Sequence, residues 1–165
     1  MLDITRYRDG MAMLAGAVNV ITTDGPQGKA RFTATAVCSV TDQPPTLLVC
    51  MNRASYAHPF FTGNGVLCVN LLSSELRELS GVFANREIAM EQRFARTEHT
   101  PLVTGSPALA GALVNFDCRI VQIHDVGSHS IFFCEVVDIL QSEAKPALVY
   151  FNRSYHPVGT VAEAA

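Results

Sequence analysis

Short runs of apolar and β-branched residues recur along the chain, separated by turn residues. They predict extended segments at 17–23, 29–41, 46–52, 66–72, 112–125, 130–140 and 147–152. Segment 112–125 alternates most clearly, with one face formed by Val114, Phe116, Cys118 and Ile120 and the other by Asn115, Asp117 and Arg119. Segments 46–52, 66–72 and 130–140 lack clean alternation, so we expect both of their faces to be covered.

Helical spacing is confined to a few short stretches. The opening segment predicts a helix capped by Asp3, and a second helix is expected to start at Ser73 or Ser74 and to run through Phe83. Residues 53–65 are expected to be helical or irregular and broken by Pro59, 86–94 to add a helical turn, and 95–106 to form a loop. Several short strands, tight turns and minor helices predict a single domain over residues 1–165, a mainly antiparallel β-barrel.

The composition adds an expectation about assembly. The chain has 165 residues, of which 16% are charged and 48% hydrophobic, and its mean hydropathy is positive. An ordinary soluble domain carries about 25% charged residues. We therefore expect a homo-oligomer that buries an apolar face, the alternative being a monomer with a patchy surface.

Charge and cysteine content exclude several classes of function. The net charge is −3 and the basic residues are scattered, so nucleic acid is not an expected partner. No apolar run approaches a membrane span and the N-terminus lacks a signal-peptide core, so we expect a cytoplasmic protein without a membrane partner. The five cysteines show no paired spacing and are expected to be small buried hydrophobes, with no metal site.

The segment 33–41 carries hydroxyl groups at every second position over much of its length. In one continuous strand Thr33, Thr35, Ser39 and Thr41 would share a face, opposite small or β-branched residues. Such a strip would let a flat ligand approach the backbone closely. The alternative is an ordinary threonine-rich strand with one solvated face.

Three further segments carry candidate binding residues. Arg53 can bind a phosphate, and Ser55 can cap a helix whose amides receive an anion. The alternative is that Ser55 is a simple helix cap and Arg53 a solvated arginine. His129 lies at a strand-to-strand turn, where it can orient a ligand or has no role. Tyr155 and His156 offer an aromatic ring and an imidazole near the C-terminus, or only a strand edge.

Several common motifs are absent from the sequence. It contains no GxGxxG, no GxxxxGK[ST] and no GxSxG, so neither a Rossmann dinucleotide site nor a P-loop nor a hydrolase elbow is encoded.

The whole pattern resembles the short-chain flavin reductases that serve two-component flavin monooxygenases. The resemblance covers residues 6–158 and is carried by FTATAVCSVTDQPPTLLVCMN (32–52), LCVNLL (67–72), GSHSIFFCEV (127–136) and NRSYHPV (152–158). It implies a homodimer of split, Greek-key antiparallel β-barrels with a few short helices. It also implies hydride transfer from NADH to a non-covalent, exchangeable FMN or FAD, with NADPH left open. The reduced flavin would then pass to a partner monooxygenase.

The resemblance also implies roles for individual residues. It places the flavin ring against Thr33, Thr35 and the neighbouring Ala34, Ala36, Ser39 and Val40, and the ribityl phosphate at Asn52, Arg53 and Ser55. The Arg93–Phe94 pair would flank the flavin tail. His129 would place the nicotinamide and is the one candidate catalytic residue, with Tyr155 and His156 as further nucleotide contacts. Ser128 stands where many relatives carry aspartate, which leaves the role of that position open.

Two other classes of function remain open at this point. A flavin-binding electron carrier or storage protein would hold flavin without turning over a nicotinamide. A purely structural dimerisation domain would bind no flavin at all.

Overall fold

The computed structural model describes residues 1–78, 89–95 and 97–159, without the side chains of Met90 and Arg93. The strands are β1 (Gly16–Ala17), β2 (Asn19–Thr23), β3 (Ala30–Ala34), β4 (Val37–Asp42), β5 (Pro45–Asn52), β6 (Val66–Leu71), β7 (His99–Pro101), β8 (Pro107–Leu109), β9 (Val114–Val126), β10 (His129–Gln141), β11 (Ala147–Phe151) and β12 (Ser154–Val158). The helices are α1 (Ile4–Ala12), α2 (His58–Asn64), the 3₁₀ turn η1 (Ser74–Leu76) and α4 (Met90–Ala95). The predicted mainly β, antiparallel fold is confirmed.

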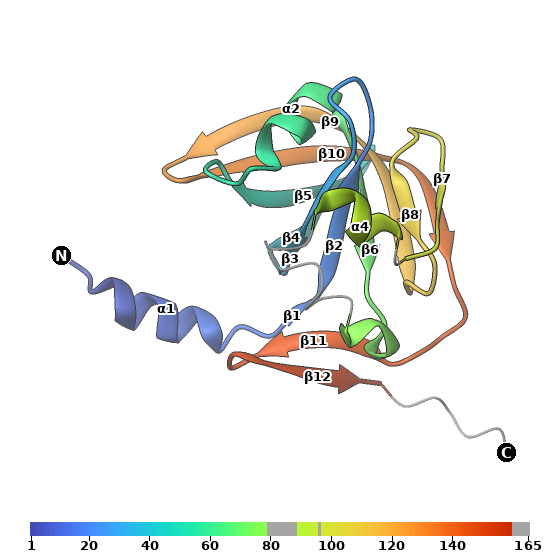
Figure 1. The fold of residues 1–165 in the computed structure, drawn as a ribbon. Helices are drawn as coiled ribbons and strands as arrows, with labels where there is room; N and C mark the ends of the chain where they lie inside the picture. Colours follow the sequence, from blue (N-terminus) through green and yellow to red (C-terminus); the bar gives the residue numbers. More distant parts are fainter. Residues whose placement is uncertain (79–88, 96, 160–165) are drawn as a thin grey trace, which may run out of the picture.

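A seven-stranded sheet in the order β3-β2-β6-β9-β10-β5-β4 forms the body of the fold (Figure 1). Its two outermost strands, β3 and β4, are consecutive in the chain and separated only by Thr35 and Ala36. A connection this short reaches only about 10 Å, so the sheet has to curl until its edges meet. Cys50 N–H donates to the Ala36 carbonyl at 3.0 Å and continues the pairing across the corner.

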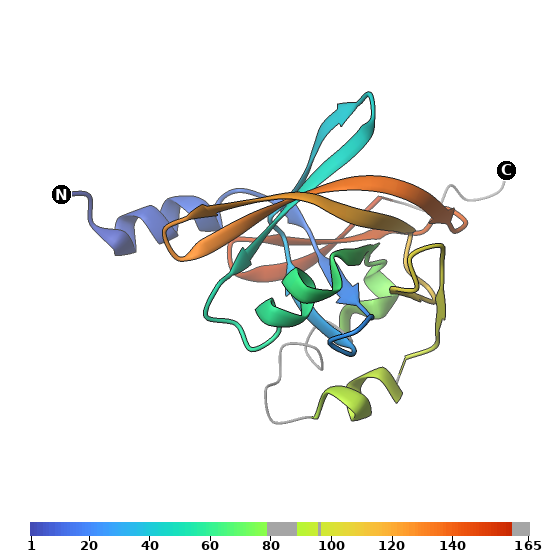
Figure 2. The ribbon, with the colours of Figure 1, turned by 90° about the horizontal axis from the view of Figure 1, so that it is seen from above.

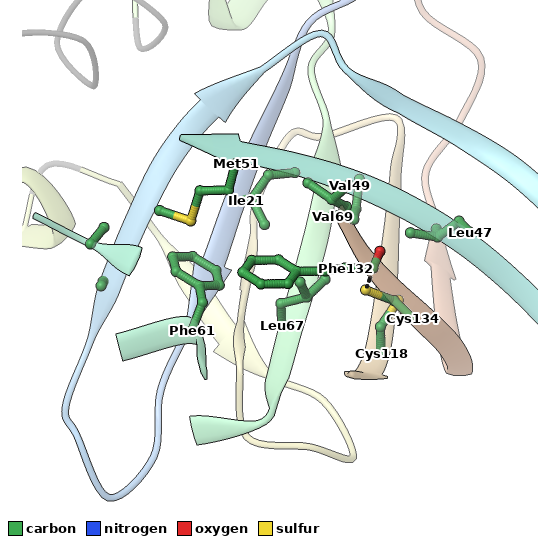
Figure 3. Packing of buried hydrophobic residues seen from close by; sticks show 12 residues of the cluster. Ile21, Leu47, Val49, Met51, Phe61, Leu67, Val69, Cys118, Phe132 and Cys134 are labelled. Atoms are coloured by element: carbon green, nitrogen blue, oxygen red, sulfur yellow. Dashed lines mark hydrogen bonds between the residues drawn. The ribbon is translucent and has the colours of Figure 1, made fainter. Parts of the chain in front are cut away.

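The main core fills the inside of this curled sheet. Phe61 of α2 stacks on Phe132 of β10 with ring centroids 6.5 Å apart (Figure 3). The rings of Phe32 and Phe61 meet edge to face, with centroids 5.1 Å apart. Around them pack further fully buried side chains, among them Ile21, Val49, Met51, Leu67 and Val69. Burial of this apolar set is the main stabilising term of the barrel.

A second layer covers the outer face of β2, β6 and β9. The β7–β8 hairpin and the separate sheet β1-β11-β12 lie over it, and between the layers Val18, Val20, Leu72, Leu109 and Leu148 form a second apolar cluster. Polar side chains here are buried but paired. Asn115 donates to Asn70 Oδ1 at 2.7 Å, and Asp117 accepts from Thr104 N–H at 2.7 Å. Both faces of β6 are thus covered, as expected from its pattern.

Helix α1 extends away from the barrel and buries none of its residues (Figures 1 and 2). Its predicted cap is confirmed, because Asp3 accepts from Thr5 N–H at 2.9 Å. Arg153 pairs with Asp9 at 2.6 Å and ties the helix to the turn between β11 and β12. None of the described helices is both long enough and apolar enough to span a membrane.

Several predicted segments differ from the structure. The strand expected at 29–41 is two strands, bent at Thr35–Ala36. Pro59 does not break a helix but lies in the first turn of α2, where the missing N–H costs nothing. The expected loop 95–106 contains β7, and β12 follows β11 through a two-residue turn with Asn152 and Arg153 at positive φ. The helix expected to run through Phe83 falls largely outside the described residues.

Candidate functional site

The end of β5 and the β9–β10 turn form one cluster. Asn52 is the last residue of β5 and lies directly opposite His129, the first residue of β10. The two-residue turn Gly127–Ser128 precedes His129, with Gly127 at φ 55°, in the left-handed region that favours glycine. The turn projects past α2 in both ribbon views (Figures 1 and 2). Two segments predicted independently from the sequence therefore meet in space.

Arg53 is fastened to this turn by its backbone and by its side chain. Its N–H donates to the Ser128 carbonyl at 2.9 Å, and its Nη1 donates to the Gly127 carbonyl at 3.4 Å. Its Nε lies 3.5 Å from Asp125 Oδ2, and the side chains of both residues are half exposed. The guanidinium is held at the surface, beside the turn that carries His129.

Asp125 belongs to a hydrogen-bonded chain that reaches into the barrel. It lies opposite Ser130 on β10, and the Ser130 hydroxyl donates to Asp125 Oδ1 at 2.6 Å. Ser130 Oγ also lies 2.9 Å from His58 Nε2, and because its only proton goes to Asp125, His58 donates here. The Ser130 hydrogen bond, and then the Arg53 charge, lower the pKa of Asp125 below its ordinary value.

Sequence reasoning missed Asp125, Ser130 and His58. A signal existed for two of them, because residues that flank a two-residue hairpin turn symmetrically must face each other. His58 had no such signal, since only the packing of α2 against β10 brings it near Ser130.

Asn52 and Ser55 shape the loop between β5 and α2. Asn52 Oδ1 accepts from Ala54 N–H at 2.9 Å, and Ser55 Oγ accepts from Ala57 N–H at 3.3 Å. The expected helix cap at Ser55 is wrong, because Ala57 holds the cap position of α2 and makes no side-chain capping bond. Ser55 instead closes a local turn ahead of the helix.

His129 is exposed at the start of β10. Its Nδ1 lies 2.9 Å from the hydroxyl of Ser128. Ser128 therefore fixes the orientation of the imidazole ring locally, which gives a structural role to the position that the sequence left open.

The continuous hydroxyl strip predicted for segment 33–41 is not present. Thr33 pairs with Val20 and shares its outer face, whereas Ser39 pairs with Leu47 and shares its core-directed face. The bend at Thr35–Ala36 causes this, because residue 34 and residue 37 both point inward and the alternation is reset between them. The expectation that a flat ligand approaches the backbone along these hydroxyl groups therefore applies to the bend at Thr33–Ala36 and not to Ser39 or Val40.

Phe94 lines a cavity of about 710 Å³ between the β2–β3 turn, α2 and α4. Its ring is almost fully buried, and Arg31 lies over it at 4.9 Å from the centroid. Lys29, Tyr56 and His99 also line this cavity. Arg93 is part of α4, but its side chain is outside what the structure describes.

Tyr155 and His156 lie in the separate sheet β1-β11-β12. The Tyr155 ring packs on Tyr150 at 5.2 Å, and His156 Nε2 lies 3.3 Å from the Phe151 carbonyl. Tyr155 also packs against the second apolar cluster, on the far side of the sheet from the core, so the structure does not bring the two residues into the cluster around His129. Within the described residues, no group of three or more His, Cys, Asp or Glu side chains is placed to hold a metal ion.

The cluster suits binding and orientation of an anionic ligand. Arg53 supplies a fixed positive charge, and His129 supplies an exposed imidazole beside it.

Comparisons with known proteins agree on one family. The family model described as "Flavin reductase like domain" matches residues 11–159. The protein named FMN reductase (NADH) RutF of Stutzerimonas stutzeri is 57% identical over 150 residues, which span 91% of this chain and 86% of that protein. The protein of the same name from Pantoea ananatis is 56% identical over 152 residues, covering 92% and 80%.

Solved structures show the same fold. A candidate flavin reductase from Haemophilus somnus superposes with a TM-score of 0.92 at 52% identity, covering 95% of this chain and 100% of that one. BorF, the flavin reductase component of a bacterial two-component tryptophan halogenase, gives 0.89 at 27% identity, with coverage of 96% and 100%.

Proposed function

We propose, from the premise that the chain belongs to the flavin reductase-like domain family, that it is an NADH-dependent flavin reductase. Its preferred flavin would be FMN, as the names of its relatives indicate. The observation that carries the proposal is the meeting of Asn52–Arg53 with the turn that bears His129. This arrangement puts a phosphate-binding cation beside an exposed imidazole, as two nucleotides bound side by side would require.

The two nucleotides supply the redox chemistry, a hydride passing from nicotinamide C4 to flavin N5. The task of the chain is then to hold two flat rings in contact and to stabilise the negative charge of the reduced flavin. This work needs no nucleophile or general base of the protein.

Each part of the flavin has a proposed contact. Arg53, with Asn52 and Ser55, would hold the ribityl phosphate. The ring would lie at the bend Thr33–Ala36, where Thr33 Oγ1 is buried without a hydrogen-bond partner among the residues that the structure describes. An unpaired hydroxyl at this place fits a ring that carries carbonyl and nitrogen acceptors.

The remaining contacts are proposed from the resemblance alone. Ser39 and Val40 lie beyond the bend, and Phe94 with Arg93 would flank the flavin tail. His129 would place the nicotinamide. Tyr155 and His156 have the least structural support as nucleotide contacts, because they lie in the separate sheet β1-β11-β12.

Reversible flavin binding would allow the reduced product to leave for a partner monooxygenase in the cytoplasm. Assembly as a homodimer is supported by exposed apolar side chains on α1 and on β4 and β9, including Tyr7, Val40 and Val121. Analytical ultracentrifugation tests the dimer, and a monomer at micromolar concentration would contradict it.

The activity test is the consumption of NADH by the purified chain, with and without added FMN or FAD. We expect many turnovers that depend on added flavin, faster with FMN than with FAD and slower with NADPH than with NADH. A stoichiometric yellow protein that leaves NADH untouched would instead identify a flavin carrier. No flavin binding at all would identify a structural module.

A further inference from the structure

We infer that Asp125 is a positioning residue that acts through Arg53 and sets the affinity of the site for a ligand phosphate. This inference rests on the proposed function, in which Arg53 binds the phosphate of FMN. Nothing in the sequence singled out Asp125. The structure places its carboxylate beside the guanidinium of Arg53 and bonded to the Ser130 hydroxyl.

The two carboxylate oxygens of Asp125 have separate partners. Oδ1 accepts from the buried Ser130 hydroxyl at 2.6 Å, which fixes the rotation of the carboxylate, and Oδ2 faces Arg53 Nε at 3.5 Å. Ser130 is itself fixed by His58 from helix α2. The chain of contacts therefore leads from the inside of the barrel to an exposed cation.

The geometry leaves the outer end of the guanidinium for a ligand. Asp125 meets the Nε side of Arg53, and the Gly127 carbonyl accepts one N–H of Nη1. A guanidinium carries five N–H groups, so the remaining ones on Nη1 and Nη2 can meet a phosphate end-on. A free arginine side chain has many rotamers, and fixing it before the ligand arrives lowers the entropy lost on binding.

The role differs from that of a simple counter-ion. If Asp125 only competed with the phosphate for Arg53, its removal would strengthen phosphate binding. If it orients Arg53, its removal weakens binding of ligands that carry the phosphate and leaves other ligands unaffected. Riboflavin has the ring and the ribityl chain of FMN without the phosphate, so it distinguishes the two cases.

The experiment measures the dissociation constants of FMN and riboflavin by flavin fluorescence for the full chain and its Asp125→Asn variant. We expect Kd for FMN to rise about fivefold, the upper range for a half-exposed ion pair, and Kd for riboflavin to stay within about twofold. Unchanged or tighter FMN binding overturns the inference, and so does equal weakening of both ligands.

Two further variants test whether the effect passes through Arg53. In an Arg53→Met background, Asp125→Asn should change Kd for FMN no further, because the group it positions is gone. Ser130→Ala removes the hydroxyl that fixes the Asp125 carboxylate, so we expect it to weaken FMN binding in the same direction, but less than Asp125→Asn does, because the Asp125–Arg53 pair itself remains. Additive effects of Asp125→Asn and Arg53→Met on Kd for FMN, or tighter FMN binding by Ser130→Ala, would overturn the inference.

The outcome is separable from that of the proposed function. If the wild-type chain binds no flavin and leaves NADH unoxidised, the proposed function fails. If the wild type reduces FMN normally and the Arg53 and Asp125 substitutions are additive, only the positioning role fails.

Discussion

Asn70→Leu should be among the most destabilising single substitutions outside the apolar core. Asn70 is fully buried on β6, and its Oδ1 accepts from Leu109 N–H at 2.8 Å and from Asn115 Nδ2 at 2.7 Å. Leucine has a similar volume but no acceptor, so the Leu109 N–H is left buried and unpaired. Asn115 keeps only its longer bond of 3.2 Å to the Leu109 carbonyl.

The expected loss is set mainly by these two donors. The Val20 carbonyl and Thr22 Oγ1 also lose a hydrogen bond, from Asn70 Nδ2, but an acceptor left short of a donor costs less than an unpaired N–H. A buried donor without a partner costs about 1–3 kcal/mol, and weakening of the second bond adds about 1 kcal/mol. We therefore expect the free energy of unfolding to fall by about 2–4 kcal/mol, against a total of about 5–15 kcal/mol for a domain. For a chain of this size the same loss lowers Tm by roughly 5–15 °C.

The assay is urea unfolding followed by far-UV circular dichroism, because the chain has no tryptophan. Protein concentration is kept fixed, since dimerisation would make the midpoint depend on it. Asn152→Gly is the control, an exposed turn position at φ 47° that glycine adopts freely, and should stay within about 1 kcal/mol of wild type. A loss below about 1 kcal/mol for Asn70→Leu would show that this network does not hold the β7–β8 hairpin on the sheet.

Three further predictions concern the site, the thiols and pH. His129→Ala should raise KM for NADH about tenfold and leave Kd for FMN within twofold. A collapse of flavin binding would show that the turn is wrongly assigned. In the native protein at pH 8, Ellman's reagent should react with exposed Cys38 and slowly with Cys50, whose pKa is raised by burial. Burial also raises the pKa values of the thiols of Cys68, Cys118 and Cys134. The reagent should react with these three only after denaturation. The folded state lowers the pKa of Asp125, so its carboxylate stabilises the fold at pH values above the ordinary pKa of 3.8. This stabilisation is lost as the pH falls through the lower pKa of the folded state. Asp125→Asn should therefore flatten the acid-unfolding profile over that range of pH.

The local sequence pattern was sufficient to predict most strands and the turns that contain glycine or proline. Alternation over 112–125 and the β-branched runs at 17–23 and 46–52 predicted strands that the structure contains. Asp3 was identifiable as a cap, because capping depends on residues only two or three positions apart. The resemblance then supplied the family, which periodicity alone could not have done.

The division of 29–41 into two strands was not readable from the sequence. Thr, Ala, Val and Ser fit one long strand as well as two short ones. The bend at Thr35–Ala36 arises because β3 and β4 are opposite edges of a sheet that has to close on itself. It is this closure that separates Thr33 from Ser39.

The sequence by itself therefore determined most of the extended segments, the turns marked by glycine and proline, and a set of residues that could bind an anionic nucleotide. These properties depend on side-chain chemistry and on contacts between near neighbours. Only the tertiary structure decided that Arg53, Asp125, Ser130 and His58 form one chain of contacts, and that Tyr155 stays apart from them. The contacts of Arg53 with the β9–β10 turn and of His58 with Ser130 join residues more than seventy positions apart, and their existence depends on how the barrel closes rather than on any local pattern.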